Sequence, residues 1–518
     1  MKLRPLALAL AALLPASAFL ACSDNGTGID VPTFDSGTKD TGGNTGKDGG
    51  PTTDGGPTTD GGDGGVQEQG TLLKAGDVQV VGVMPDGTAV YLSFGAKISL
   101  EAVAITGGAP TVIAADLKLS SPGKPTDDSF QVSQGVVGLW TGTDAATGNA
   151  KLQIWTKANG LKDAAALAPA ADFVAGSADG TRVGFIRHVG ANDELVVSLT
   201  TFAVAANVVQ SPLGRGTAGT ACDPDFGFQG KYLFSATCTG AQTTATIRRS
   251  EDTGGPVSIA TGQNPLVNAS AAGDRVFAWT RPGVGRAYSI SAGGTVTSIP
   301  VENGIAEGVI SDDGTAVFYR TNQGAIHKAA TTTAANVVTL VDNAGAMGLL
   351  GFSSDFKNLL SHKLAPGGTA QSPRFDLQLS GTAAAAAPTV LVAAATALPI
   401  GFTGNGSHAL YIPDPATATV LKARPVAGGG AEKDLGKISS FGGSIAGSSK
   451  IILGDNPTEI TVGGQKTTVL DYKLLDVAGA GAATPLLTAV DPGLDLALAG
   501  KKVLFTQPGK GLFVKDVP

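Results

Sequence analysis

Histidine and cysteine, the side chains from which most zinc sites are built, are rare in this sequence. Its 518 residues include only four histidines and three cysteines. The histidines are separate from one another, and each lies in or directly after a segment with strand-like alternation: His188, His327, His362 and His408. A zinc site needs three or four convergent ligands, and the GxSxG motif of serine hydrolases is missing. The motifs therefore indicate no catalytic, cofactor-binding or metal-binding residue, and they favour a protein that is not an enzyme.

Aromatic residues make up 5% of the chain, and acidic residues outnumber basic ones by 43 to 36. Trp140, Trp155 and Trp279 fall in strand-like segments, where packing in a core explains them. Carbohydrate sites need exposed aromatic platforms, so a carbohydrate ligand is not expected. Residues 1–21 carry a charge of +2 and residues 22–68 carry −7, which leaves −2 of the total of −7 for the rest. A nearly neutral body without a basic run excludes nucleic acid as a partner.

The N-terminus reads as an export signal. Lys2 and Arg4 precede a short apolar run that is too short to span a membrane. The following residues, Phe19-Leu20-Ala21-Cys22, resemble the lipobox of bacterial lipoproteins, although Phe19 stands where leucine is usual. The resemblance implies that residues 1–21 are a lipoprotein signal peptide and that Cys22 is lipidated. Ser23 resembles the outer-membrane sorting signal, which implies an outer membrane lipoprotein of a bacterial cell envelope, facing the periplasm or the surface. The alternative is an ordinary secretory signal in which Cys22 has no role.

Residues 22–68 predict a disordered tether. The segment is rich in Gly, Asp and Thr and contains the sequence PTTDGG twice. It has scarcely a residue that could enter a hydrophobic core. A Gly-rich chain of roughly 45 residues has an end-to-end distance on the order of 35 to 40 Å, enough to hold a folded body away from a lipid surface.

Residues 69–518 contain ten copies of one phrase, in which a turn precedes an alternating apolar strand. The five clearest copies are MPDGTAVYLSF (84–94), SADGTRVGFIR (177–187), SAAGDRVFAWT (270–280), SDDGTAVFYR (311–320) and TGNGSHALYI (403–412). Weaker copies begin at Ser133, Phe228, Ser353, Ile445 and Leu498. The copies are spaced by about 40 to 53 residues, the period of four-stranded propeller blades. We therefore predict an all-β propeller of about ten blades; fewer blades with merged copies, or two smaller rings, are the alternatives.

The adjacent carboxylates of Asp312 and Asp313 raise the question of a metal or acid/base pair. Other copies have Ala271-Ala272 or Gly404-Asn405 at this place, which a turn tolerates and a ligand set would not. Asp313-Gly314 is therefore interpreted as the hairpin turn between the first two strands of a blade, with Gly314 at positive φ.

These phrases resemble the WD40-like "PDG" repeats of the TolB propeller family and of the propellers in prolyl-oligopeptidase-type peptidases. The match covers residues 72–518, but it consists of the turn and the strand that follows it. It implies the fold, and neither family's activity or partner is carried over.

The ring is expected to close by pairing of its two ends. The last copy supplies three strands within Leu496–Val517, and Gly70–Gly76 reads as an orphan outer strand. Pairing of this N-terminal strand with the C-terminal ones would complete the closing blade and remove exposed edges. The long intervals before Phe228 and Leu498 could hold extended hairpins.

The two remaining cysteines predict a disulfide. Cys222 and Cys238 lie on either side of an expected turn at Gln229-Gly230-Lys231, and opposed strand positions lie about 4.5 to 5.5 Å apart, within disulfide range. An exported protein favours this cross-link. The alternative is two free buried thiols.

Together these patterns predict a lipid-anchored cell-envelope β-propeller that acts as a non-catalytic binding or scaffolding module. Its expected partners are the membrane, through the anchor, and an envelope or extracellular protein. The alternative is a propeller enzyme of the lyase or quinoprotein type with a site at the channel mouth. Convergence of His, Arg and carboxylate side chains from several blades at that mouth would separate the two.

Overall fold

In the computed structural model the described part of the chain is all-β: forty strands and no helix. The described residues are 70–118, 128–143, 150–164, 171–189, 192–202, 209–212, 225–229, 232–239, 242–249, 257–262, 266–280, 284–291, 295–333, 337–344, 351–367, 374–383, 388–395, 397–415, 419–427, 430–462, 464–479, 481–491 and 497–518. Within these ranges no helix could cross a membrane.

The strands form ten four-stranded antiparallel sheets, which we call blades 1 to 10 in chain order. Blade 1 contains β2 (Asp77–Val83), β3 (Thr88–Phe94), β4 (Ile98–Ala104) and β5 (Thr111–Ala114). Blade 2 contains β6 (Ser129–Ser133), β7 (Val136–Thr143), β8 (Ala150–Thr156) and β9 (Gly160–Asp163). Blade 3 contains β10 (Ala171–Gly176), β11 (Arg182–Val189), β12 (Asn192–Leu199) and β13 (Val209–Pro212). Blade 4 contains β14 (Asp225–Gln229), β15 (Tyr232–Thr239), β16 (Gln242–Arg249) and β17 (Val257–Gly262). Blade 5 contains β18 (Leu266–Ala269), β19 (Arg275–Trp279), β20 (Val284–Ile290) and β21 (Val296–Asn303).

The second half of the chain repeats this arrangement. Blade 6 contains β22 (Ile305–Ile310), β23 (Ala316–Thr321), β24 (Ile326–Ala330) and β25 (Val338–Val341). Blade 7 contains β26 (Gly351–Phe352), β27 (Asn358–Leu364), β28 (Phe375–Gly381) and β29 (Thr389–Ala395). Blade 8 contains β30 (Leu398–Phe402), β31 (His408–Ile412), β32 (Val420–Pro425) and β33 (Lys433–Lys437). Blade 9 contains β34 (Ser440–Ser444), β35 (Lys450–Val462), β36 (Gln465–Asp476) and β37 (Thr484–Val490). Blade 10 contains β38 (Ala497–Ala499), β39 (Lys502–Gln507), β40 (Gly511–Asp516) and β1 (Thr71–Ala75).

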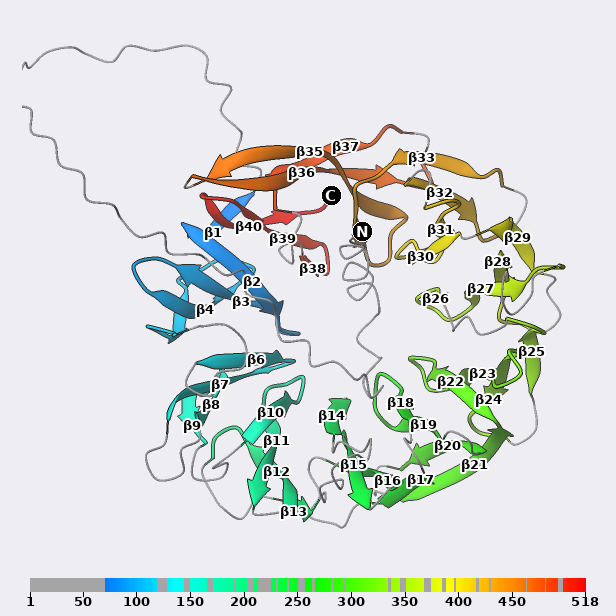
Figure 1. Ribbon diagram of the computed structural model, residues 1–518, viewed down its shortest axis with the longest axis horizontal. Coiled ribbons are helices and arrows are strands. Elements are labelled where there is room, and N and C mark those ends of the chain that lie inside the picture. The colour runs from blue at the N-terminus through cyan, green and yellow to red at the C-terminus, as the bar shows by residue number, and fades with distance from the viewer. Residues whose placement is uncertain are drawn as a thin grey trace, which may run out of the picture.

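The blades stand around a common centre, with the first strand of each blade innermost (Figure 1). Each of the ten repeated phrases forms the turn and second strand of its own blade, as the period predicts. The protein is thus a β-propeller.

The N-terminal strand completes the last blade, which confirms the predicted pairing of the chain ends. Thr71 of β1 lies opposite Val514 of β40, and Ala75 lies opposite Gly511. Leu73 of β1 is buried in a cluster that joins blade 10 to blade 1.

The hydrophobic core lies between the blades. Each blade shares a cluster of buried apolar side chains with the blade on either side, and the junction of blade 10 with blade 1 is no exception. This arrangement follows from the sequence, because the second strands contain nearly continuous apolar runs, such as TAVYL in β3 and HALYI in β31. Successive side chains point to opposite faces, so such a run places apolar side chains on both faces of the sheet. Tyr91, Tyr319, Tyr411 and Phe505 are among the largest fully buried side chains.

The long interval before Leu498 does hold an extended hairpin. β35 and β36 of blade 9 are 13 and 12 residues long, and they pair with each other well beyond the part that pairs with β34 and β37. We call residues 458–469 of this hairpin the arm. The part of the interval before Phe228 that precedes residue 225 lies outside the described residues, apart from β13.

Candidate functional site

The turns between the first and second strands of the blades lie on one face of the ring, and we call them together the turn rim. A glycine of the repeated phrase has positive φ in seven blades, including Gly314 with φ 69°. Asp313 accepts hydrogen bonds from Ser311 Oγ (2.6 Å) and from the amide of Thr315 (3.0 Å). The interpretation of Asp313-Gly314 as a hairpin turn is therefore confirmed.

Neighbouring turns of the rim contact each other through their backbones. Ala271 N donates to Asp312 O at 3.1 Å, and Asn405 N donates to Ser448 O at 3.0 Å. A Cβ built on Gly314 would lie 2.4 Å from Cγ of Arg275 in the preceding blade. The rim is thus closely packed, and its glycines serve contact between blades as well as the turn itself.

The rim carboxylates are held by their own turns. Burial by itself would raise the pKa of Asp179, but hydrogen bonds from Ser177 and Thr181 outweigh it and lower the pKa. The Ser311 hydroxyl and the Thr315 amide lower the pKa of Asp313. Burial and the neighbouring charge of Asp313 raise the pKa of Asp312. The lowered carboxylates are ionised acceptors within single turns, an arrangement suited to structure and not to proton transfer.

Three buried tyrosines each donate to a glutamate that also contacts a lysine or a histidine. In blade 1 Glu101 Oε2 accepts from Tyr91 OH (2.9 Å) and lies 2.8 Å from Nζ of Lys74 in β1. Because Lys74 belongs to blade 10, this contact joins the two ends of the ring. Burial and the bond to Glu101 raise the pKa of Tyr91 far above its ordinary value.

Blades 6 and 8 have the same type of cluster. Glu302 Oε2 of blade 5 accepts from Tyr319 OH (2.7 Å) and lies 2.8 Å from Nδ1 of His327 in blade 6. The third cluster joins Tyr411, Glu432 and Lys422. None of the three clusters is predicted by a sequence motif. The one signal in the sequence is Glu101, the only charged residue in the apolar strand β4.

The three described histidine side chains lie in different blades and have different partners. His327 meets Glu302, His362 Nε2 lies 3.3 Å from Ala397 O, and His408 Nδ1 lies 2.9 Å from Ser407 Oγ. Burial lowers the pKa of His362 and of His408. The side chain of His188 lies outside the described residues.

Polar side chains of the innermost strands bind the backbone of neighbouring blades. Gln131 Oε1 accepts from Val174 N at 3.1 Å, and Asn268 Oδ1 accepts from Ile310 N at 2.9 Å. Ser444 Oγ donates to Phe402 O at 2.8 Å. Among the residues that the structure describes, no group of three or more His, Cys, Asp or Glu could hold a metal ion. The described inner strands therefore use their polar groups to join blades.

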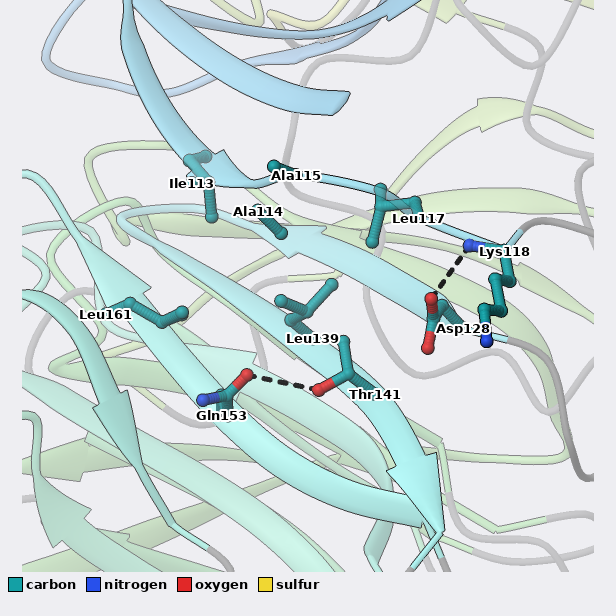
Figure 2. A pocket seen from close by; sticks show the side chains of 10 residues that line it. All are labelled: Ile113, Ala114, Ala115, Leu117, Lys118, Asp128, Leu139, Thr141, Gln153 and Leu161. Carbon is teal, nitrogen blue, oxygen red and sulfur yellow. Dashed lines mark hydrogen bonds between the residues drawn. The ribbon is translucent and has the colours of Figure 1, made fainter. Parts of the chain in front are cut away.

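A cleft of about 760 Å³ opens between blades 1 and 2 (Figure 2). Its apolar walls are formed by Ile113 and Leu117 on one side and by Leu139 and Leu161 on the other. Thr141, Gln153, Lys118 and Asp128 supply the polar part of the lining.

Two hydrogen bonds order the polar part of this cleft. Thr141 Oγ1 donates to Gln153 Oε1 at 3.2 Å, and the backbone amide of Lys118 donates to Asp128 Oδ2 at 2.8 Å (Figure 2). The first bond uses the amide oxygen of Gln153 and leaves its amide nitrogen able to donate. The volume is within the range of ligand sites, and the mixture of apolar walls with a few polar groups is typical of them.

The cleft opens on the face opposite the turn rim. Thr141 lies near the end of β7, away from the turn that precedes Val136. On the other wall, Leu117 N donates to Ile98 O, and Ile98 is the first residue of β4, just after the turn that joins β3 to β4. No motif pointed to this site, because its walls come from two blades and from strand positions that repeat in every blade.

The residues of the predicted anchor and disulfide fall largely outside the described ranges. Cys22 and Cys222 are not described, and of Cys238 only the backbone is, opposite Thr243 in the β15–β16 pair. The register of β14 and β15 places Gln229 opposite Tyr232, so the chain reverses between these two residues. The lipidation and the cross-link stay predictions.

Comparisons with known proteins show fold likeness alone. No family model and no curated protein matches the sequence. A crystal structure of the eukaryotic initiation factor is similar with 13% identity and a TM-score of 0.38, over 70% of this chain and 88% of that one. TolB from Acinetobacter baumannii is similar with 12% identity and a TM-score of 0.24, over 57% and 77%.

A third solved structure is the β-propeller domain of the Trilobed protease from Pyrococcus furiosus. It has 13% identity and a TM-score of 0.27, over 59% of this chain and 96% of that one. Identities and scores this low carry no argument about function. The assignment of the propeller fold to this chain rests on its own ten sheets.

Proposed function

We propose that the protein is a lipid-anchored β-propeller of the bacterial cell envelope that acts as a non-catalytic binding or scaffolding module. The observation that carries this proposal is the use of its ionisable side chains. The rim carboxylates accept hydrogen bonds from their own turns, and the glutamates contact tyrosines together with a lysine or a histidine. The described histidine side chains lie in separate blades. Catalysis needs such groups to converge on one reacting atom, whereas binding needs a rigid surface.

The described part of the chain begins on the side of the turn rim. Lys502, next to the turn rim, lies opposite Asp516, and Val514 two residues earlier lies opposite Thr71. Gly70, the first described residue, therefore lies on the side of the turn rim. The cleft between blades 1 and 2 opens on the opposite face, where a protein partner can reach it.

The anchor is tested by Cys22→Ser. The variant should lose acyl labelling and should be recovered in soluble form, because two or more acyl chains are what hold such a protein on a membrane. A matched control is Ser23→Ala, which leaves the acylated residue in place. Acylation and membrane retention that persist in the Cys22→Ser protein would rule the anchor out.

The binding role is tested by cross-linking in intact cells followed by affinity capture of the protein. We expect one or a few envelope proteins to be captured in stoichiometric and saturable amounts, and single His→Gln replacements at His327, His362 and His408 to leave the amounts unchanged. Loss of capture in all three variants would instead point to a site built on histidine.

A further inference from the structure

The outer strand of blade 1, β5, has an unprotected edge. Among the described strands β5 pairs with β4 alone, so one row of its backbone groups is unpaired. Its four residues, TVIA, include no charge and no proline. Six of the ten outer strands carry a charge or a proline, among them β9 with Lys162, β21 with Pro300 and β37 with Pro485. The outer strands β17, β25 and β29 lack both, as β5 does, so β5 differs from them by the cleft beside it. Charges and prolines on an edge prevent other strands from adding to it, and β5 has neither.

Both faces of β5 present apolar surface to an added strand. Val112 is 56% exposed, the highest value among the large hydrophobic side chains of the described residues. Its neighbour Ile113 points to the opposite face, is 4% exposed, and lines the cleft. Successive side chains of a strand point to opposite faces. A strand placed beside β5 would therefore direct alternate side chains over Val112 and into the cleft.

We propose that the edge of β5 and the adjoining cleft bind an extended peptide segment of a protein partner, which adds to blade 1 as a fifth strand. This inference rests on the proposed binding function and names its site. The peptide carries apolar residues at alternate positions, and these enter the space between Leu117, Leu139 and Leu161. The residues between them lie over Val112. The Gln153 amide nitrogen donates to a peptide carbonyl. Main-chain pairing with an exposed edge and pockets for alternate side chains are the two components of this mode of recognition.

The geometry favours a peptide over two other occupants. A small apolar molecule would fill the cleft but would leave Val112 and the β5 backbone uncovered. A second copy of this chain would bring its own four-residue β5 to the edge, and the cleft of each copy would keep its volume. An extended peptide satisfies the edge, the exposed valine and the cleft together.

The test uses fluorescence anisotropy with the full chain and a defined probe. The probe is a fluorescein-labelled, end-capped peptide of four alternating Thr-Val pairs followed by lysine. Two control peptides carry methyl groups on all valine amides or on all threonine amides. In a strand these two sets point to opposite edges, so pairing with β5 requires that at least one control peptide loses binding.

The matched protein variants are Val112→Lys and Val390→Lys. Val390 is 48% exposed on β29, another outer strand, but it does not line the cleft. Both side chains are exposed, so neither change should affect folding. We expect saturable binding of the probe, at least tenfold weaker binding to Val112→Lys, and unchanged binding to Val390→Lys.

Three results would overturn the proposal: no saturable binding of the probe, equal weakening in both variants, or unchanged affinity of both methylated peptides. Self-association in sedimentation experiments that Val112→Lys abolishes would assign the edge to a second copy and would overturn it as well. Capture of the envelope partner by the Val112→Lys protein separates the two hypotheses. Undiminished capture keeps the binding function and places it elsewhere on the ring, whereas absence of capture by the parent protein refutes the function itself.

Discussion

Val462, near the tip of the arm, lies against Gly509 in the turn between β39 and β40. A Cβ built on Gly509 would come within 3.0 Å of Cγ1 of Val462. The arm belongs to blade 9 and the turn to blade 10, so the arm reaches the blade that closes the ring. Two segments from outside the C-terminal three strands therefore contact blade 10. The β1 strand pairs with its outer edge, and the arm packs on the turn at the end of its second strand.

Replacing Val462 with Asp should release the arm. A carboxylate placed against the apolar side of the turn costs on the order of 1 kcal/mol or more, because it is partly removed from water without a partner. We expect faster proteolytic cleavage within residues 456–468. Limited trypsin digestion with mass spectrometry measures the rate of this cleavage. Thr461→Asp is the matched control, since Thr461 is exposed and the next residue on the strand. Equal cleavage rates in the two variants would show that the contact with Gly509 does not hold the arm.

Ring closure by β1 is tested by two adjacent leucines. Leu73 is 7% exposed within the cluster between blades 10 and 1, whereas Leu72 is 43% exposed. Leu73→Ala should lower the free energy of unfolding by about 2 to 5 kcal/mol, as buried leucines do when truncated to alanine. Leu72→Ala should change it by less than about 0.5 kcal/mol. Urea unfolding followed by tryptophan fluorescence measures both, and similar midpoints would mean that β1 does not close the ring.

Deletion of Gly70–Gly76 is the stronger form of the same test. It removes all the pairs that β1 makes with β40, so we expect sharply increased proteolysis of the segment after residue 496. Deletion of the seven residues 51–57 from the predicted tether is the length-matched control. A truncated protein as resistant as the parent would exclude closure by this strand.

The turn rim predicts a strong effect at Gly314. Alanine there would adopt φ 69° and place its Cβ 2.4 Å from Cγ of Arg275, which should cost roughly 1 to 3 kcal/mol of stability. Gly107 has φ 97° but no atom within 4 Å of its built Cβ. Gly107→Ala therefore measures the backbone cost alone, and a smaller loss than for Gly314→Ala in thermal unfolding would isolate the contact between turns. Equal losses would show that the rim glycines serve φ only.

Glu101 predicts a dependence of stability on pH. Burial would raise its pKa, but hydrogen bonds from Lys74, Ser99 and Tyr91 outweigh this and hold the pKa below the ordinary value of 4.5. A carboxyl group whose folded pKa is lowered stabilises the protein above the unfolded value, and this contribution is lost as the pH falls through the folded value. Glu101→Gln should therefore cost about 1 to 3 kcal/mol at pH 7 and progressively less below about pH 4.5.

The control for this change is Glu459→Gln on the arm. Glu459 pairs with Lys466, but both side chains are mostly exposed, and such pairs contribute little. Urea unfolding of the three proteins between pH 3 and 7 measures the difference. A constant difference between Glu101→Gln and the parent over this range would show that the carboxylate charge is not what stabilises the junction of blades 10 and 1.

The blades could be predicted from the sequence because they depend on interactions between residues that are close in the chain. The Asp-Gly phrase fixes a turn, because Gly supplies positive φ and Asp caps its own backbone. The apolar run after it fixes a strand with two buried faces. Both effects involve neighbours in the chain, so the number of blades, their strands and the pairing of Thr71–Ala75 with β40 followed from the repeat and its orphan strand.

The tyrosine–glutamate clusters and the cleft could not be predicted, because they depend on contacts between residues that are far apart in the chain. Glu302 meets His327 across a blade junction, and the cleft combines Ile113 of β5 with Leu139 and Gln153 of the next blade. The corresponding strand positions exist in every blade. The residues that surround them differ from one blade junction to the next, because each pair of sheets packs with different facing side chains. The sequence by itself determined the repeating unit, whereas only the tertiary structure decided which junction leaves an open cleft beside an unprotected edge.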